Sequence, residues 1–260
     1  MTATATSIKT GNENQQNSPV AIEMIHLKKS FGNNHVLRDI SLVIYKGENL
    51  VILGQSGTGK SVLIKCIVGL EIPDEGKLNI LGQNISELKG KKLVEIRKRV
   101  GFLFQSGALY DSMTVRENLE FPLRRQIPPM AEEEIEKLVK EALEEVGLAE
   151  TIELSPSELS GGMRKRLGLA RTLILKPEIM LYDEPTTGLD PITSREISSL
   201  ILEVQKKYNT SSIIITHDII CARLTADRII VLKDGVCAAE GTFNELEKSD
   251  DPWIKSFFEK

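Results

Sequence analysis

One eight-residue motif constrains this chain more than any other feature of its sequence. Residues 54–61 match the pattern GxxxxGK[ST] in full. In this pattern, glycines let the backbone curl around a polyphosphate so that successive N–H groups point inward, and the helix that follows adds its positive end. Lys60 is expected to reach the terminal phosphates and the Ser61 hydroxyl to bind Mg²⁺, whereas an ordinary glycine-rich turn is the alternative. The predicted nucleotide site consists of Gly54, Gln55, Ser56, Gly57, Thr58, Gly59, Lys60 and Ser61.

The residues on both sides of this motif predict an α/β fold. A short apolar run at 49–53 precedes it, and residues from about 60 to 70 carry apolar side chains on one helical face. Helical stretches separate several further β-rich runs, which indicates a largely parallel sheet. Asp234-Gly235 lies between two strand-like runs and predicts a hairpin turn. The β-rich runs are 99–104, 178–182, 211–216 and 227–232.

Residues 106–172 differ from the rest because they show little strand pattern. Apolar residues recur at helical spacing over 131–146, with acids and lysines on the other face. Two favourable i,i+4 pairs, Glu133–Lys137 and Glu136–Lys140, are expected on that exposed face. We therefore expect a helical insertion at about 106–172 in the α/β body.

Composition argues against several classes of protein. The chain has 260 residues, and its 37 acidic and 33 basic residues give a net charge of −4, which disfavours a general nucleic-acid binder. No apolar run approaches the ~18 residues of a membrane-spanning helix. Three scattered cysteines favour a reducing compartment. The polar residues 1–19 are expected to form a disordered arm rather than a secretory signal or a transit peptide.

Polar residues follow three of the expected strands. Asp183-Glu184 follows the run IMLY, Gln105 follows VGFLF, and His217 follows SSIIIT. Ligands of open α/β sheets bind at the carboxyl ends of the strands, so Asp183 is a candidate for the Mg²⁺ shell. Glu184 is a candidate for the general base that polarises an attacking water, and the Gln105 amide can bind a metal and water without carrying charge. Taken singly, each of these residues is as well explained by a structural role at a strand end.

A further segment carries a family resemblance. Leu159-Ser160-Gly161-Gly162-Met163 precedes a basic helical run, RKRLGLAR, and resembles the signature motif of ATP-binding cassette (ABC) ATPases. The phosphate motif, Gln105, the acid pair, Thr187-Gly188-Leu189-Asp190 and His217 occur in the family's order, and the resemblance covers residues 20–245. It implies a RecA-like P-loop NTPase fold with an antiparallel β subdomain and an inserted α-helical subdomain. Residues 20–245 would form the ATPase domain and residues 246–260 a short C-terminal helix or tail.

The same resemblance implies roles for individual residues. Phe31 resembles the aromatic residue that stacks on the adenine of ATP, although core packing is the alternative. In this family two chains pack head to tail, so the resemblance implies a homodimer in which the signature of one chain closes on the nucleotide of the other. The implied catalytic residues are Glu184, His217 and Lys60, the Mg²⁺ ligands are Ser61, Gln105 and Asp183, and the dimer seam holds Ser160, Gly161, Gly162 and Asp190.

Three short segments indicate which branch of the ABC ATPases the chain resembles most. The run FQSGALY at 104–110, Met163 in the signature and the segment 190–193 are similar to the ATPase of Mla/Mce-type phospholipid transport systems. That similarity implies a membrane permease contacted near Gln105–Leu123, an Mce-type substrate-binding protein reached indirectly, and a place on the cytoplasmic face of the bacterial inner membrane. The C-terminal Trp253, Phe257 and Phe258 are also similar to that family's tail, but simple packing explains them as well.

Other interpretations stay open from the residues alone. Because such an ATPase rarely touches cargo, an importer or exporter of another solute, such as an amino acid or a lipoprotein, is the main alternative. A cassette ATPase acting on ribosomes or DNA usually carries two cassettes, a long coiled coil or zinc cysteines, and a P-loop kinase or GTPase leaves Ser160-Gly161-Gly162 unexplained. A basic stretch at 88–99 either faces anionic lipid or is a solvated surface; it holds Lys89, Lys91, Lys92, Arg97, Lys98 and Arg99.

Overall fold

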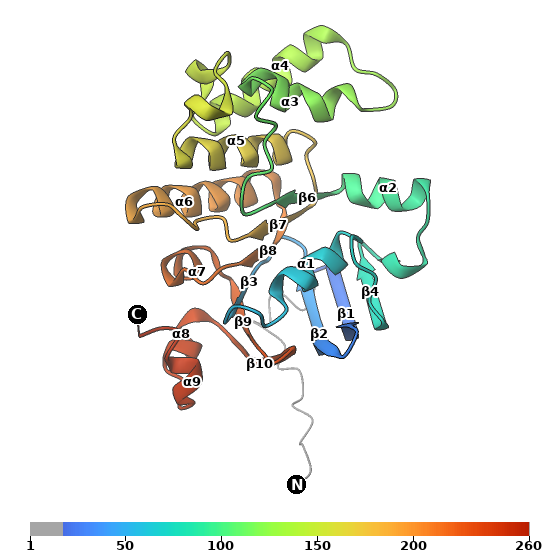
Figure 1. Ribbon diagram of the computed structural model, residues 1–260, viewed down its shortest axis with the longest axis vertical. Helices are drawn as coiled ribbons and strands as arrows, with labels where there is room; N and C mark the ends of the chain where they lie inside the picture. Colours follow the sequence, from blue (N-terminus) through green and yellow to red (C-terminus); the bar gives the residue numbers. More distant parts are fainter. Residues whose placement is uncertain (1–17, 260) are drawn as a thin grey trace.

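The computed structural model describes residues 18–259, so the expected N-terminal arm lies outside the described residues except for Ser18 and Pro19. The strands form one ten-stranded sheet in the order β5-β4-β1-β2-β10-β9-β3-β8-β7-β6 (Figure 1). The strands are β1 (Val20–Phe31), β2 (Asn34–Tyr45), β3 (Asn49–Gly54), β4 (Glu75–Ile80), β5 (Gln83–Asn84), β6 (Val100–Leu103), β7 (Ile179–Asp183), β8 (Ser211–Ile215), β9 (Arg228–Lys233) and β10 (Val236–Gly241).

The sheet has a parallel half and an antiparallel half. β3 pairs in parallel with β8 and β9, and β7 pairs in parallel with β6 and β8. At the other end, β1 is antiparallel to β2 and β4, and β4 is antiparallel to β5. β10 returns antiparallel to β9 directly after Asp234-Gly235, as the sequence predicts, and meets β2 through one parallel pair, Val236 with Asp39. The predicted fold class, a mostly parallel α/β sheet with an antiparallel β part and inserted helices, is confirmed.

Helices pack on both faces of the sheet. In Figure 1, α3, α4 and α5 lie beyond α6 at one end of the molecule, and α1 lies against the strands beside the antiparallel half. The α-helices are α1 (Lys60–Ile67), α2 (Lys91–Lys98), α3 (Val115–Arg124), α4 (Glu132–Glu145), α5 (Gly161–Leu173), α6 (Pro191–Tyr208), α7 (Ile219–Thr225), α8 (Phe243–Glu247) and α9 (Pro252–Lys255). Three 3-10 helices cover Ile85–Glu87, Ala149–Thr151 and Pro156–Glu158.

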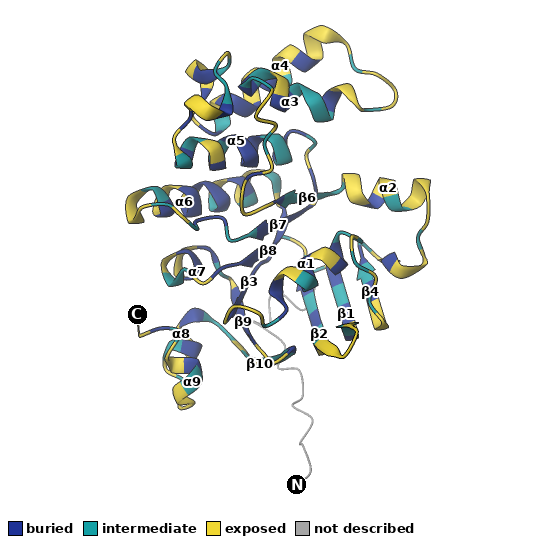
Figure 2. Cartoon of the chain, viewed as in Figure 1, coloured by how far each residue is buried: buried dark blue, intermediate teal, exposed yellow. Residues whose placement is uncertain are grey.

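β3 is buried on both of its faces, which fixes the position of the loop that follows it. Val51 and Leu53 belong to an apolar core shared with α3 to α7, and Leu50 and Ile52 belong to a second core shared with α1 and the antiparallel strands. Successive side chains of a strand point to opposite faces, so a strand between two cores is apolar throughout. Figure 2 shows this central part of the sheet as the most deeply buried region of the chain.

The segment between β6 and β7 is helical, as its sequence predicts. On α4 the buried residues include Ile135, Val139 and Leu143, and Lys140 pairs with Glu136 at 2.9 Å as expected. The other expected pair is wrong, because Lys137 lies 3.8 Å from Glu141 instead of pairing with Glu133. Both acids are one turn from Lys137, so i,i+4 spacing alone could not select between them. The division into domains at 106–172 and 246–260 stays a prediction.

The aromatic residues near the C-terminus pack on the chain itself. The Phe243 and Phe258 rings meet edge to face with centroids 5.1 Å apart, and Lys233 Nζ lies 4.4 Å from the Trp253 ring centroid. These contacts support the packing explanation of the tail. Among residues 18–259, no helix combines the length and apolarity needed to cross a bilayer.

The basic stretch at 88–99 is partly committed to contacts within the chain. Arg97 donates to the carbonyl oxygens of Val68 and Gly69, and Arg99 pairs with Glu178 at 2.5 Å. Lys98 donates to the Gln126 amide oxygen at 3.1 Å. Half of the six cations therefore make contacts within the chain, and the choice between a lipid-facing and a solvated surface stays a prediction.

Candidate functional site

The phosphate motif forms the turn between β3 and α1. Gly57 and Gly59 have φ values of +84° and +101°, which residues with a Cβ rarely adopt. A Cβ on Gly59 would also lie 2.9 Å from Leu37 Cδ2 and 3.0 Å from the Val36 carbonyl oxygen. Both conformation and space therefore require glycine, and β2 packs directly against the loop.

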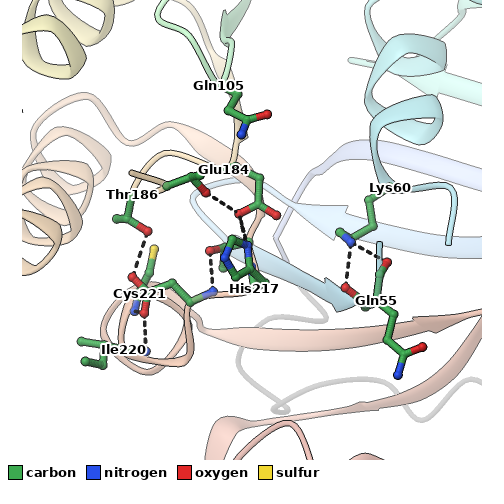
Figure 3. Close-up of polar contacts among 12 residues, drawn as sticks. Gln55, Lys60, Gln105, Glu184, Thr186, His217, Ile220 and Cys221 are labelled. Atoms are coloured by element: carbon green, nitrogen blue, oxygen red, sulfur yellow. Dashed lines mark hydrogen bonds and ion pairs between the residues drawn. The ribbon is translucent and has the colours of Figure 1, made fainter. Parts of the chain in front are cut away.

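Lys60 is folded back onto this loop. Its Nζ donates to the carbonyl oxygens of Gly54 at 2.7 Å and Gln55 at 2.9 Å (Figure 3). Burial lowers the pKa of Lys60, while the nearby carboxylates of Glu184 and Asp183 act in the opposite direction. A phosphate anion would offset the cost of burying this ammonium. Lys60 is thus positioned for the predicted phosphate contact.

The acid pair stands at the end of β7, where a buried strand meets an open edge. Ile179 to Tyr182 are fully buried, whereas Asp183 and Glu184 are half-buried. Glu184 has a φ of +52°, so its backbone leaves the strand conformation and its carboxylate turns toward the next strand end. There Glu184 Oε2 lies 2.7 Å from His217 Nδ1 and accepts a hydrogen bond from the Thr187 hydroxyl at 3.1 Å (Figure 3). The structure therefore brings together two residues that lie 33 positions apart in the sequence.

The loop that carries His217 is tied to the loop after Glu184. Asp218 accepts hydrogen bonds from the N–H groups of Ile220 at 2.9 Å and Cys221 at 3.2 Å, which caps α7. The other oxygen of Asp218 accepts from the Thr186 hydroxyl at 2.9 Å. Sequence reasoning missed Thr186 and Asp218, although an aspartate directly before a helix start is a recognisable capping signal.

Three of the predicted site residues offer oxygen atoms that suit Mg²⁺. Ser61, Gln105 and Asp183 supply a hydroxyl, an amide and a carboxylate, the hard ligands this ion prefers. Burial raises the pKa of Asp183, the Glu184 carboxylate raises it further, and neighbouring lysines oppose both effects. A cation would relieve the repulsion between these two acids, so the donor set and its electrostatics fit the ion.

The signature residues lie at two adjacent helix starts. Ser160 caps α5 by accepting from the Met163 N–H at 3.2 Å, and Asp190 caps α6 by accepting from the N–H groups of Ile192 and Thr193. A Cβ on Gly162 would lie 2.5 Å from Thr193 Cγ2, so the two helix starts are in close contact. Within the described part of the chain, no hydrogen bond joins them to the phosphate loop.

Phe31 lies at the exposed end of the β1–β2 hairpin. Its side chain is 47% exposed, so the alternative that it packs in the core is wrong. Lys29 Nζ lies 5.1 Å from the ring centroid, and β2 of the same hairpin touches the phosphate loop at Gly59. An exposed ring beside the loop is compatible with adenine stacking, which stays a prediction.

A phosphate loop on a parallel sheet, with acids and a histidine at the neighbouring strand ends, defines the class of P-loop nucleoside triphosphatases. The ABC transporter family model matches residues 37–187, more than half of the chain. The chain is 42% identical over 247 residues to a probable ribonucleotide transport ATP-binding protein, mkl, of Mycobacterium leprae, an alignment that covers 95% of this chain and 71% of that protein. It is 39% identical over 236 residues, 91% of this chain and 89% of the relative, to the intermembrane phospholipid transport system ATP-binding protein MlaF of Haemophilus influenzae.

A solved structure extends this comparison to three dimensions. The dimeric ATP-binding cassette MJ0796, bound to ADP and phosphate, superposes with a TM-score of 0.78 at 33% identity, over 85% of this chain and 98% of that one. The chain belongs to the ABC transporter family and is an ATP-binding cassette ATPase.

Proposed function

We propose that this chain is the ATP-hydrolysing subunit of a transporter that moves phospholipid between membranes through a separate permease. The observation that carries the cargo assignment is the similarity to MlaF over 91% of the chain, together with the run FQSGALY at 104–110. The chain would work on the cytoplasmic face of the bacterial inner membrane. It would contact an Mce-type substrate-binding protein only indirectly, through the permease.

The hydrolysis step is assigned to residues at the strand ends. Glu184 is the general base that takes a proton from the attacking water, and its 2.7 Å contact with His217 Nδ1 holds the carboxylate in place. Lys60 and His217 stabilise the negative charge that develops on the γ-phosphate. When bound, Mg²⁺ would be held by Ser61, Gln105 and Asp183 and would neutralise charge on the phosphate oxygens.

Each ATP site is completed by a second copy of the chain, packed head to tail. The start of α5 carries the exposed, neutral Ser160, and a helix start of this kind binds an anion through its free N–H groups, whereas the exposed Asp190 caps α6 with its own carboxylate. The relative MJ0796 is a dimer with bound ADP and phosphate, which supports the pairing of two copies. Ser160 and Gly162 of one protomer therefore contact the γ-phosphate held by its partner, and Asp190 lies at the seam. ATP stabilises the closed dimer because it binds that state better than the open one.

The permease is assigned to two grooves lined by Phe104, the residue before Gln105, and so close to the segment Gln105–Leu123. One groove of about 220 Å³ is lined mainly by apolar residues that include Leu70, Phe102 and Phe104. A second groove of about 240 Å³ shares Phe102 and Phe104, but it has a mixed lining that includes Lys98 and Arg171. An apolar helix face fits the first groove, and its contact with Phe104 would place it next to Gln105.

The cargo is tested with the chain and its co-purified permease in vesicles. ATP-dependent transfer of a labelled phospholipid between donor and acceptor vesicles is expected for the wild type and is lost with Glu184→Gln. Uptake of a labelled ribonucleotide serves as the competing assay, because mkl carries that name. Ribonucleotide uptake without lipid transfer would overturn the cargo assignment and leave the ATPase assignment intact.

A further inference from the structure

Lys165 is a buried cation in the second turn of the signature helix. Its residue is 7% exposed, and its Nζ donates to two main-chain carbonyl oxygens, those of Gln105 and of Glu184, the latter at 3.2 Å. These carbonyls belong to the loops that follow β6 and β7. One side chain of α5 therefore joins two strand ends of the nucleotide site.

The same face of α5 holds the Gln105 loop at two further points. A Cβ on Gly168 would lie 3.1 Å from Gly107 Cα, so helix and loop approach closely there. Arg171 donates to the Ala108 carbonyl oxygen, and its guanidinium carbon lies 4.7 Å from the Tyr110 ring centroid. Lys165, Gly168 and Arg171 follow one another at intervals of three residues, which places them along one face of the helix.

The position of Lys165 is costly for a charged group. Burial lowers its pKa, and the nearby carboxylates of Glu184 and Asp183 only partly oppose this effect. An apolar side chain of similar length would avoid the cost of desolvation. It would also leave the Gln105 and Glu184 carbonyl oxygens without this donor. The buried ammonium group is therefore what links the two loops.

We propose that Lys165 is a positioning residue that couples the signature helix to Gln105 and to the backbone of Glu184. When the signature at the start of α5 closes on the partner's ATP, Lys165 moves the Gln105 loop with the helix. Through its hydrogen bond to the Glu184 carbonyl oxygen, it also keeps the Glu184 carboxylate in position to act as the base. This inference rests on the proposed ATPase function, because it concerns the geometry of that reaction. Lys165 touches no reacting atom.

The test compares steady-state ATP hydrolysis by the full chain and by three variants. Lys165→Met removes the donor while keeping the length of the side chain, and should lower kcat about 10-fold or more with KM for ATP changed less than about 3-fold. Lys165→Arg keeps a cationic donor and should retain at least about a third of the wild-type kcat. Lys140→Met, which removes an exposed lysine from α4, is the matched control and should match the wild type.

The outcomes separate this inference from the proposed function. Unchanged kcat in Lys165→Met, or equal losses in the Met and Arg variants, would overturn the positioning role while wild-type hydrolysis still stands. Absence of hydrolysis by the wild type would instead overturn the ATPase function. If Lys165→Met does not fold, Lys165→Gln replaces it: a kcat well below that of Lys165→Arg supports the role, and equal values overturn it.

Discussion

Two regions of this molecule differ in how burial and hydrogen bonds shift the pKa values of their charged groups. The strand-end face holds Lys60, Asp183 and Glu184, and the signature face holds Ser160, Gly162 and Asp190. On the strand-end face, burial lowers the pKa of Lys60 and raises that of Asp183. On the signature face, Asp190 is exposed and its pKa is lowered by hydrogen bonds from Thr193. On the strand-end face, burial disfavours the charged forms of Lys60 and Asp183. On the signature face, the charge of Asp190 is stabilised because it caps α6.

This contrast suits the two faces to different roles in the proposed ATP site, namely binding the charge of the ligand and contacting a second copy of the chain. Groups that are expensive to bury, such as Lys60 and Asp183, stabilise ligand charge strongly because they are already desolvated. The α5 start at Ser160 is neutral and needs no burial to attract an anion, whereas the Asp190 carboxylate already caps α6, so both can remain exposed to solvent. Under the proposed function, the strand-end face would carry out hydrolysis and the signature face of a second copy would dock onto it.

The largest effect is expected on the strand-end face. Glu184→Gln removes the proposed base but keeps the shape of the side chain, so kcat should fall about 1,000-fold. ATP binding should persist, and the variant should accumulate as an ATP-bound dimer, seen by size-exclusion chromatography with ATP. The exposed Glu144→Gln is the control. Hydrolysis at the wild-type rate by Glu184→Gln would show that another group acts as the base.

A smaller effect is expected on the signature face. Gly162→Ala forces a Cβ against Thr193 Cγ2, 2.5 Å away, and should lower kcat about 10-fold by separating the two helix starts. ATP binding by the isolated chain, measured with a fluorescent analogue, should stay unchanged because the phosphate loop is untouched.

Thr193→Ser supplies the matched rescue of that variant. It removes the methyl group that meets the new Cβ and keeps the hydroxyl that donates to Asp190. The double variant should recover most of the lost kcat. Failure to recover would mean that contact with Thr193 is not the cause of the loss.

The two aspartates should shift thermal stability in opposite directions. Hydrogen bonds hold the pKa of Asp190 below 3.8, so its charge stabilises the fold at neutral pH, and that stabilisation is lost as pH falls through the folded-state pKa. Asp190→Ala should therefore lower Tm by roughly 2 °C at pH 7, measured by scanning fluorimetry. Asp190→Asn keeps a capping oxygen and should lower Tm less; equal losses would contradict the capping role.

Asp183 is expected to give the smallest effect, of the opposite sign. Burial and the Glu184 carboxylate raise its pKa, so the folded chain binds the proton more tightly and ionisation costs stability as pH rises above 3.8. Asp183→Asn should raise the Tm of the nucleotide-free chain by roughly 1 °C while abolishing hydrolysis. The exposed Asp250→Asn should leave Tm unchanged. A lower Tm for Asp183→Asn would remove the contrast between the two faces.

Much of the fold follows from local patterns because they depend on near neighbours. The run 49–53 predicted a buried strand, the phosphate motif predicted the turn, and the spacing over 131–146 predicted a helix. Lys137 shows the limit of such reasoning, since two acids stand at equivalent spacing and side-chain packing selects between them. Phe31 shows the same limit, because only the position of its hairpin decides whether the ring is buried.

The sequence by itself determined which residues are candidates for the chemistry: the phosphate motif, the acids at 183 and 184, Gln105, His217 and the signature. Tertiary structure decided which of them meet. The Glu184–His217 contact depends on β7 and β8 being neighbours in the sheet, and the Lys165 bridge depends on α5 lying beside the Gln105 loop. Motif spacing is set by covalent geometry over a few residues. Contacts across 33 or 60 positions exist only after two apolar cores have fixed the strands and helices in place.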